Sequence, residues 1–248
     1  MRMSFWRWSI RLFFVMVSSP AFALVGPAVE DPSYADHVVM VLKRAVGRAS
    51  FCTGVVLAPR VILTAAHCVA AIGDMRVHYR DDAGRPVLIE VDAIAVHPGY
   101  RADAAARRVV SIDLALVRTR TPIDPRFSAA ALDADGVVAV GRPLRILGYG
   151  VAREGEGSSA GVLRGAALRV RAPLSKVLLW AEDPDDAGGG ACAGDSGGPI
   201  LADDTRQVLA ISAWSTGGGA RHCGTITQGP LVAPQRGWID GVLRGWGL

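Results

Sequence analysis

The sequence predicts an all-β protein assembled from many short strands. Half of its 248 residues are apolar, and its 29 glycines recur along the chain. Short β-rich runs separated by glycine-containing turns are typical of antiparallel sheets, and no long stretch keeps the heptad spacing of a coiled coil. A chain of this length can bury either one sizeable core or two smaller ones.

The charge of the chain argues against a polyanionic partner. The formal net charge is +4, but Arg2, Arg7 and Arg11 lie in a segment that we expect to be removed. Without these three, 24 of the 27 basic residues remain against 23 acidic ones, a net charge of about +1. Such a balance does not favour binding to nucleic acid or to a membrane surface.

Residues 1–23 are typical of a secretory signal peptide. Arginines precede the apolar run at positions 12–17, and Ala21, Phe22 and Ala23 supply the small-x-small pattern of a cleavage site. A membrane anchor is the alternative, but the run is far shorter than the ~20 residues that span a bilayer. We therefore expect residues 24–248 to form an exported protein, secreted or periplasmic, in which disulfides can form.

Three strands are predicted near the start of this exported chain. Residues 38–42 and 51–57 are rich in β-branched and other apolar side chains. The polar, glycine-containing segment 43–50 separates them, so we expect the two strands to pair. Val61–Thr64 predicts a third strand, which ends three residues before His67.

The middle of the chain alternates between β-rich runs and turns. Residues 109–117 form a β-branched, largely apolar run that Asp113 interrupts. Burying this charge would be costly unless the carboxylate has a hydrogen-bonding partner. Residues 121–125 are rich in turn formers and are the expected connector between two halves of the fold, while residues 144–150 alternate and predict another strand.

The sequence ends in a predicted amphipathic helix. Apolar residues recur there with the spacing of one helix face, at Trp238, Ile239, Val242, Leu243 and Trp246. We expect this face to pack on the second half of the fold, which assigns the two tryptophans to the core. Upstream, the glycine- and serine-rich residues 154–161 predict a surface loop.

A serine set among glycines is the strongest functional signal. Ser196 lies in the sequence Gly-Asp-Ser-Gly-Gly-Pro, whose glycines let the backbone adopt positive φ and turn N–H groups inward. A serine hydroxyl is a weak nucleophile unless a base and an orienting acid assist it. His67 in Thr-Ala-Ala-His-Cys is the candidate base, and Asp113 in Asp-Leu-Ala-Leu is the candidate acid.

These three motifs, in the order His, Asp, Ser, resemble those of the chymotrypsin-like (trypsin-like) serine peptidases. The resemblance implies two six-stranded antiparallel β-barrels, residues 24–120 and 121–248, with a C-terminal helix and the active site in the cleft between the barrels. It also implies an endopeptidase in which Ser196 attacks the substrate, His67 transfers the proton and Asp113 orients His67. The N–H groups of Gly194 and Ser196 would bind the oxyanion. A protein or peptide substrate, no cofactor and a monomeric state are expected.

The four cysteines allow three disulfide pairings. The family resemblance selects Cys52–Cys68 and Cys192–Cys223. A histidine precedes a cysteine at two places, but neither place has the ligand spacing of a zinc site, so we expect no metal. His97 lies in a His-Pro-Gly-Tyr turn that also resembles the family, and we expect a structural role for it.

Cleavage after Ala23 would have a mechanistic consequence. The new terminus, Leu24 followed by Val and Gly, resembles the Ile-Val-Gly-Gly start of activated family members. The resemblance implies an ion pair between the α-amino group of Leu24 and the carboxylate of Asp195, which would shape the oxyanion hole. We therefore expect signal peptidase itself to activate the enzyme. Pro27 replaces the second glycine, and a longer pro-segment ending elsewhere is the alternative.

The expected specificity pocket is neutral. Gly190 stands six residues before Ser196, where the trypsin-like branch carries an aspartate. Alignment with the family places Ser215 and Gly229 on the pocket walls. A neutral, open pocket favours a large apolar or aromatic residue before the scissile bond.

Two alternatives for this specificity stay open. Asp185 and Asp186 both lie just upstream of three consecutive glycines, so a loop shift could bring one of these two aspartates into the pocket. Arg221, near the same rim, could instead attract an acidic substrate residue.

The sequence also leaves two alternatives for the function itself. The first is a secreted binding protein that kept the fold without catalysis, although such relatives usually lack a triad residue and this chain has all three. The second is an esterase of the α/β-hydrolase type, which the order of the motifs and the lack of a Gly-x-Ser-x-Gly elbow disfavour.

Overall fold

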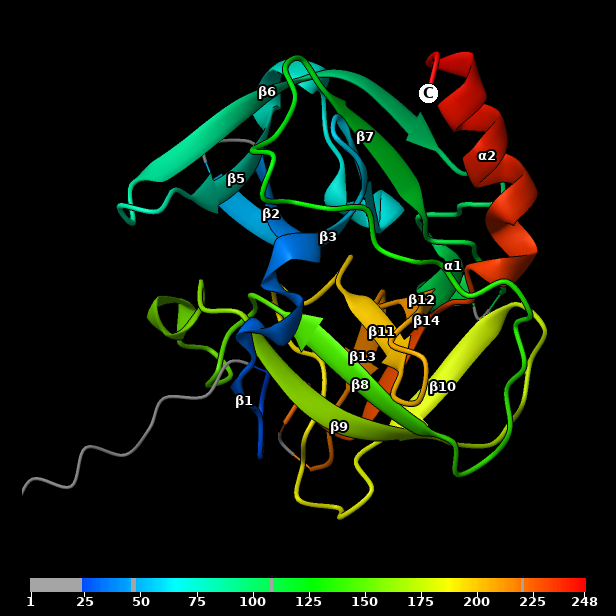
Figure 1. Ribbon diagram of the computed structural model, residues 1–248. Coiled ribbons are helices and arrows are strands. Elements are labelled where there is room, and N and C mark those ends of the chain that lie inside the picture. Colours follow the sequence, from blue (N-terminus) through cyan, green and yellow to red (C-terminus); the bar gives the residue numbers. More distant parts are fainter. Residues whose placement is uncertain (1–23, 46–47, 108, 220) are drawn as a thin grey trace, which may run out of the picture.

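The described chain forms two bodies of β structure with one helix along the side (Figure 1). The computed structural model describes residues 24–45, 48–107, 109–219 and 221–248. The predicted signal peptide, residues 1–23, lies outside the described residues. No helix within the described ranges has the length and apolar character needed to cross a membrane.

The first body is a closed antiparallel barrel. Its strands occur in the order β2-β3-β4-β7-β6-β5 around the barrel. Their bounds are β2 (Val38–Ala45), β3 (Arg48–Ala58), β4 (Val61–Thr64), β5 (Met75–Arg80), β6 (Pro86–Val96) and β7 (Ala115–Thr119). Alternate side chains fill the interior, where Ile62 of β4 and its cross-strand partner Val117 of β7 are both buried.

The second body is a larger sheet with the strand order β12-β11-β8-β9-β10-β14-β13. Its strands are β8 (Pro143–Gly148), β9 (Arg164–Val170), β10 (Leu178–Glu182), β11 (Pro199–Ala202), β12 (Val208–Ile211), β13 (Trp214–Thr216) and β14 (Ile226–Pro230). An additional short strand, β1 (Val29–Glu30), pairs with β9.

The second body departs from the predicted pair of closed six-stranded barrels. Among the described residues, this sheet does not close into a barrel, because β12 and β14 do not pair as strands. A single isolated bridge, from Ala210 of β12 to Leu231 just after β14, links the two. Pro230 at the end of β14 has no N–H to donate to a ladder. Gly229 lies so close to Ile211 that a Cβ there would be 1.8 Å from the Ile211 carbonyl oxygen.

A shared apolar core joins the two bodies. Leu63 of β4 and Leu116 of β7 point out of the first barrel and belong to one buried cluster with Leu147, Leu201 and Ile211 of the second sheet. Because β4 has a buried neighbour on both faces, all four of its residues are buried. The strand that leads to His67 is therefore held firmly between the two bodies.

The C-terminal helix α2 (Arg236–Gly245) is present, as the apolar spacing predicts. Ile239 is fully buried in the shared core. The helix also contacts the first body: the Trp238 ring lies 4.8 Å from His97, and Arg118 of β7 stacks 5.5 Å from the Trp246 ring. The helix thus links both bodies, and His97 serves as part of this packing (Figure 1).

Short helices and loops complete the described chain. They include η1 (Pro32–His37), η2 (Ala66–Cys68), η3 (Ile72–Asp74), α1 (Ala104–Arg107), η4 (Gly157–Ser159) and η5 (Ala233–Gln235). The predicted β-rich run 109–117 becomes a strand only at Ala115. Its first part bonds to a neighbouring loop instead, since Ile112 donates to the Gly99 carbonyl at 3.1 Å.

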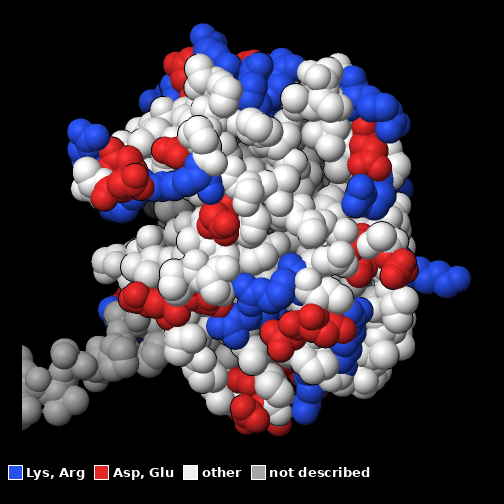
Figure 2. Space-filling model, viewed as in Figure 1, with Lys and Arg blue, Asp and Glu red and all other residues white. Residues whose placement is uncertain are grey.

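Charges of both signs are mixed over the face drawn in Figure 2. A hollow opens at the left of that view, below the hairpin of β5 and β6. A cavity of about 750 Å³ lies in this region, lined by Tyr79, Phe127 and Tyr149 together with residues of η1. None of the predicted catalytic residues lines it.

Candidate active site

The structure brings His67 and Asp113 together. His67 lies in η2, just after β4, and Asp113 lies just before β7. Because β4 and β7 are antiparallel neighbours, with Thr64 opposite Ala115, the residues beyond these ends meet at one edge of the barrel. The loop bonds described above place Asp113 there in preference to a strand position.

The contact between these two side chains fixes the imidazole. Asp113 Oδ2 lies 2.7 Å from His67 Nδ1, and Asp113 Oδ1 accepts from the backbone N–H of His67 at 2.9 Å. An ionised carboxylate can only accept, so the proton of the neutral ring stands on Nδ1 and Nε2 is left as a base. The His67 side chain is about one-third exposed (35%) and that of Asp113 is 17% exposed, so solvent reaches the base more than the acid.

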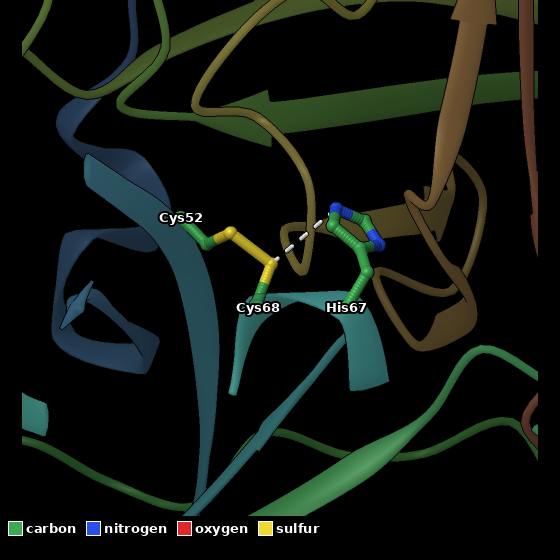
Figure 3. Close-up of side chains that lie close together, drawn as sticks. All are labelled: Cys52, His67 and Cys68. Atoms are coloured by element: carbon green, nitrogen blue, oxygen red, sulfur yellow. Dashed lines mark hydrogen bonds between the residues drawn. A yellow bond between two sulfur atoms is a disulfide. The ribbon is translucent and has the colours of Figure 1, made fainter. Parts of the chain in front are cut away.

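A disulfide holds the other side of the histidine (Figure 3). Cys52 of β3 bonds to Cys68, the residue after His67, with an S–S distance of 2.00 Å. Cys68 Sγ lies 3.6 Å from His67 Nε2. The three side chains are close enough together for a metal site, but both sulfurs are committed to the disulfide, and metal ligation by cysteine requires a thiolate.

Ser196 reaches the same edge through its backbone. We name residues 192–198 the serine loop. The Ser196 carbonyl accepts from the Thr53 N–H at 2.8 Å, and the Gly194 carbonyl accepts from Thr53 Oγ1 at 2.9 Å. Thr53 directly follows Cys52, so the serine loop is bonded to the strand whose disulfide flanks His67. No hydrogen bond joins Ser196 Oγ to His67 in this arrangement.

Glycines allow the serine loop to approach the barrel. Gly197 has φ +83°, and a Cβ on it would lie 2.1 Å from both the Thr53 carbonyl oxygen and Thr64 Oγ1. Gly194 has φ +97° and packs on the ring of Phe51. The N–H groups of Gly194 and Ser196 donate to no other described group.

Asp195, between these two residues, points away from solvent. Its side chain is fully buried, and its carboxylate accepts from the N–H groups of Gly150 and Cys192, both at 2.9 Å. Burial raises the pKa of Asp195 to about 7, although the two donors and the charge of Arg164 act to lower it. Burial dominates here because neutral donors replace only part of the hydration of an ion.

The predicted partner of Asp195 is also buried. Leu24 is fully buried, and the next residue, Val25, accepts from the Gly190 N–H at 3.2 Å. In this continuous chain the nitrogen of Leu24 belongs to a peptide bond, so it carries no charge. No contact between Leu24 and the Asp195 carboxylate is present among the hydrogen bonds of the described residues.

A cavity of about 740 Å³ lies beside His67 and Asp113. Strands β10, β13 and β14 contribute Trp180, Trp214 and Gly229 to one wall. The loop before Asp113 contributes the other wall, which includes Tyr100, Ala102, Ala104, Val109 and Val110. Apolar side chains therefore dominate the space next to the histidine.

The structure separates the predicted pocket residues. Gly229 lines this cavity, whereas Gly190 and Ser215 do not. Ser215 is paired with Thr227 across β13 and β14, and a Cβ on Gly190 would lie 3.1 Å from Thr227 Oγ1. Gly190 and Ser215 are thus grouped around Thr227, whose hydroxyl accepts from the Ala191 N–H at 3.1 Å.

The charged alternatives for the pocket lie outside the cavity. Asp185 and Asp186 are exposed, on a turn held by Asp183, which accepts from the N–H groups of Asp185 at 2.9 Å and Gly189 at 2.7 Å. Arg221 packs on Gly188. None of these residues lines the cavity beside His67.

Comparison with known proteins places this fold. The family model described as Trypsin matches residues 29–233 of the chain. The chain belongs to the trypsin family. It is 30% identical to human granzyme M over 213 residues, which cover 76% of this chain and 77% of that protein. It is 27% identical to a trypsin of Saccharopolyspora erythraea over 204 residues, covering 76% and 86% of the two chains.

A solved structure shares this architecture. The structure titled human heparin binding protein superposes with a TM-score of 0.72, covering 88% of this chain and 96% of the other. The sequence identity is 20%, so this likeness concerns the fold. The resemblance of the three sequence motifs to trypsin-like peptidases is thereby confirmed at the level of the family. The two disulfides, Cys52–Cys68 and Cys192–Cys223, are the pairs that this resemblance implies.

Two residues near the site of this trypsin-family protein were not expected from the sequence. Lys43 of β2 donates from Nζ to the His67 carbonyl at 2.5 Å. Burial lowers the pKa of Lys43, and the negative charge of Asp113 acts to raise it. Thr227 lies between Gly190 and Ser215, as described above. The signal for Thr227 was its place two residues before Gly229, on the same face of an alternating strand.

Proposed function

We propose that this trypsin-family protein is a serine endopeptidase that works through an acyl-enzyme. The observation that carries the proposal is the His67–Asp113 pair, which is joined by two hydrogen bonds at one edge of the first barrel. The serine loop is hydrogen-bonded to the same edge through Thr53. Ser196 Oγ attacks the substrate carbonyl while His67 Nε2 takes its proton. His67 then gives this proton to the leaving amine, and a water molecule attacks the acyl-enzyme by the same route.

The oxyanion would be held by the N–H groups of Gly194 and Ser196. Both groups belong to the serine loop. The backbone turns there, because Gly194 has a positive φ and the Asp195 side chain points into the interior. Removing one donor of an oxyanion hole typically costs ~3 kcal/mol of transition-state stabilisation. Asp113 stabilises the imidazolium that forms when His67 accepts the proton.

Substrate binding must bring His67 Nε2 from its place near Cys68 Sγ toward Ser196 Oγ. Catalytic hydrogen bonds are often long in free enzymes and tighten only in the complex with substrate.

We propose that the substrate residue before the scissile bond is neutral or apolar. Gly190 stands where the trypsin-like branch has an aspartate, and Asp113 is the sole carboxylate among the residues lining the cavity beside His67. Asp113 is already bonded to His67. A lysine or arginine of the substrate would therefore find no free carboxylate in that cavity, and Gly190, which lies outside the cavity, supplies no side chain to bind it.

We also propose that the enzyme acts outside the cytoplasm after signal peptidase cuts behind Ala23. The signal-like residues 1–23 and the two disulfides support export. Amino-terminal sequencing of secreted material tests this directly. A start at a residue other than Leu24 would refute it.

The experiment that tests the peptidase is active-site labelling. Wild type, Ser196→Ala and Ser158→Ala, a control at an exposed serine of η4, are treated with a fluorophosphonate probe. We expect labelling of wild type and the control and none of Ser196→Ala, with all three folded by circular dichroism. Equal labelling of wild type and Ser196→Ala would reject the proposal. A peptide library then measures the residue preference.

A catalytically silent binding protein is the second candidate. It is favoured by the position of His67 Nε2 next to the disulfide and by the fold shared with a protein whose title names heparin binding. This reading predicts that the folded wild-type protein fails to react with the probe. The labelling experiment therefore separates the two candidates.

A further inference from the structure

We propose that Lys43 is a positioning residue for the general base: its ammonium group holds the main-chain carbonyl of His67 and so fixes the direction in which the imidazole leaves the backbone. This inference rests on the proposed peptidase function, because it concerns the histidine that would transfer the proton.

The first step is a carbonyl group that the backbone leaves without a donor. The single turn η2 ends one residue after His67. Continuing this 3₁₀ turn would require the Ala70 N–H to donate to the His67 carbonyl. That N–H donates to Met75 Sδ instead, at 3.3 Å. A carbonyl at the end of a helical turn needs another partner, and among the described residues Lys43 Nζ is the donor to it, at 2.5 Å.

The second step is the strand register that brings Lys43 to this carbonyl. Lys43 of β2 is directly opposite Met75 of β5. Directly opposed residues point their side chains to the same face of a sheet. The two side chains are therefore neighbours, and each bonds one main-chain group of residues 67–70. Met75 accepts from the Ala70 N–H, and Lys43 donates to the His67 carbonyl.

The third step is the place of this face in the first barrel. Val41, two residues before Lys43, is fully buried and is opposite Cys52 on β3. The disulfide from Cys52 to Cys68 holds the other side of the histidine (Figure 3). Lys43 itself is half-buried, as expected for a lysine whose stem packs along apolar side chains while its ammonium group stays at the edge. Arg44, the next residue, is exposed on the opposite face.

The fourth step is the combined effect of two charged partners on His67. Asp113 Oδ1 accepts from the His67 N–H at 2.9 Å, and Lys43 donates to the carbonyl of the same residue. Hydrogen bonds to ionised groups are about twice as strong as neutral ones. With both main-chain groups held, the backbone of His67 has little freedom to turn, and its ring stays directed at Asp113 Oδ2.

The structure also says how Lys43 would influence the reaction. It does not line the cavity beside His67, so it acts through the histidine and not by touching the substrate. A misplacement of about 1 Å in a catalytic group can cost about 10² in rate. Loss of the bond from Lys43 should therefore slow the chemical step and leave substrate binding nearly unchanged.

The test removes the donor and keeps the rest of the site. Lys43→Met keeps an apolar stem but lacks the ammonium group, Lys43→Gln is polar but too short to reach the carbonyl, and Lys43→Arg restores a charged donor. Arg44→Met is the matched control, since Arg44 lies on the same strand and pairs with Asp74 at the surface. Circular dichroism checks the fold of each variant.

Two readouts are needed. The first is kcat and KM for a chromogenic peptide. The second is the proton NMR signal of the His67 Nδ1–H, assigned by its loss in His67→Gln. A proton between an imidazole and a carboxylate resonates far downfield and is seen only while the ring stays bonded and exchange with water is slow. This signal reports the position of His67 whether or not the protein is catalytic.

We expect Lys43→Met and Lys43→Gln to lower kcat about ten- to a hundredfold, with KM changed less than about twofold. The NMR signal should weaken in both variants. Lys43→Arg should keep kcat within about threefold of wild type and retain the signal, because a charged donor is restored. Arg44→Met should leave both readouts unchanged.

Three results would overturn the inference. An unchanged kcat and NMR signal in folded Lys43→Met would leave the lysine without a positioning role. An equal loss of kcat in Lys43→Met and Lys43→Arg would mean that packing of the stem matters and not the donor. A rise in KM at constant kcat would assign Lys43 to substrate binding.

Failure of the proposed peptidase function gives a different result, namely a wild type that reacts with neither peptide nor fluorophosphonate. The NMR signal then decides alone. Its persistence in Lys43→Met would overturn the hold of Lys43 on His67, and its loss there, with retention in Lys43→Arg, would support that hold.

Discussion

Replacing Asp113 with asparagine tests the base and its orienting acid together. The carboxylate accepts two hydrogen bonds from His67, one from Nδ1 at 2.7 Å and one from the backbone N–H at 2.9 Å. Asparagine has a single oxygen, and its amide nitrogen only donates. If the oxygen stays with the backbone N–H, the amide nitrogen faces Nδ1, and the ring carries its proton on Nε2 instead. Such a ring cannot take the proton of Ser196.

We expect Asp113→Asn to lower kcat about 10⁴-fold, which corresponds to ~5.5 kcal/mol of activation free energy. KM should change by less than about threefold, because the lost interaction operates in the transition state. The assay is hydrolysis of a chromogenic peptide at neutral pH, with Asp240→Asn as control, since Asp240 makes an ion pair with Arg236 on the surface of α2. A loss of kcat below tenfold in Asp113→Asn would refute the assigned role.

Three further predictions follow from the site and its supports. Replacing both Cys52 and Cys68 by alanine opens a link between residues 16 positions apart, and chemical denaturation should show a loss of about 3 kcal/mol in the free energy of unfolding. Gly194→Ala would place a Cβ 2.4 Å from the Phe51 ring at φ +97°, so fluorophosphonate labelling should slow by at least ~100-fold while far-UV circular dichroism is kept. In the full-length chain, the raised pKa of Asp195 means that the folded state binds a proton more tightly than the unfolded state between the ordinary pKa of an aspartate and about 7. The free energy of unfolding should therefore fall as pH rises through that window, by on the order of 4 kcal/mol, and level off above it, with no such fall in Asp195→Asn.

Each of these has a result that contradicts it. A double cysteine variant as stable as wild type would show that the disulfide adds nothing to folding. Normal labelling of Gly194→Ala would mean that the loop tolerates a side chain at a position argued to exclude one. An identical pH dependence in wild type and Asp195→Asn would assign the titration to other groups.

The sequence predicted those strands and helices whose positions follow from the local pattern of apolar residues. Strand β4 was predicted at its observed bounds, because four consecutive residues suited to burial fit a strand covered on both faces. Helix α2 followed from the spacing of its apolar residues, with Ile239 in the core. The resemblance of the three motifs to the chymotrypsin-like peptidases likewise implied the contact between His67 and Asp113, which the structure contains.

Features that depend on pairing between distant segments were missed. The second sheet fails to close at Pro230, and no local pattern reveals that the missing N–H faces β12 there. Residues 109–114 have the composition of a strand, but bonds to the loop near Gly99 override that propensity. Lys43 became visible as a neighbour of His67 only in the structure, where its Nζ donates to the His67 carbonyl.

Thr53 has a wider consequence for how the molecule loses activity. It belongs to the first body, yet three of its hydrogen bonds reach the second, to Ser196, Gly194 and Tyr149. The proposed nucleophile and its proposed base thus come from different bodies, and the bonds at Thr53 add to the shared apolar core in aligning them. If the proposed peptidase activity holds, gentle heating that loosens the boundary between the bodies should abolish it before either body unfolds, so turnover would report on their docking more sensitively than secondary structure does.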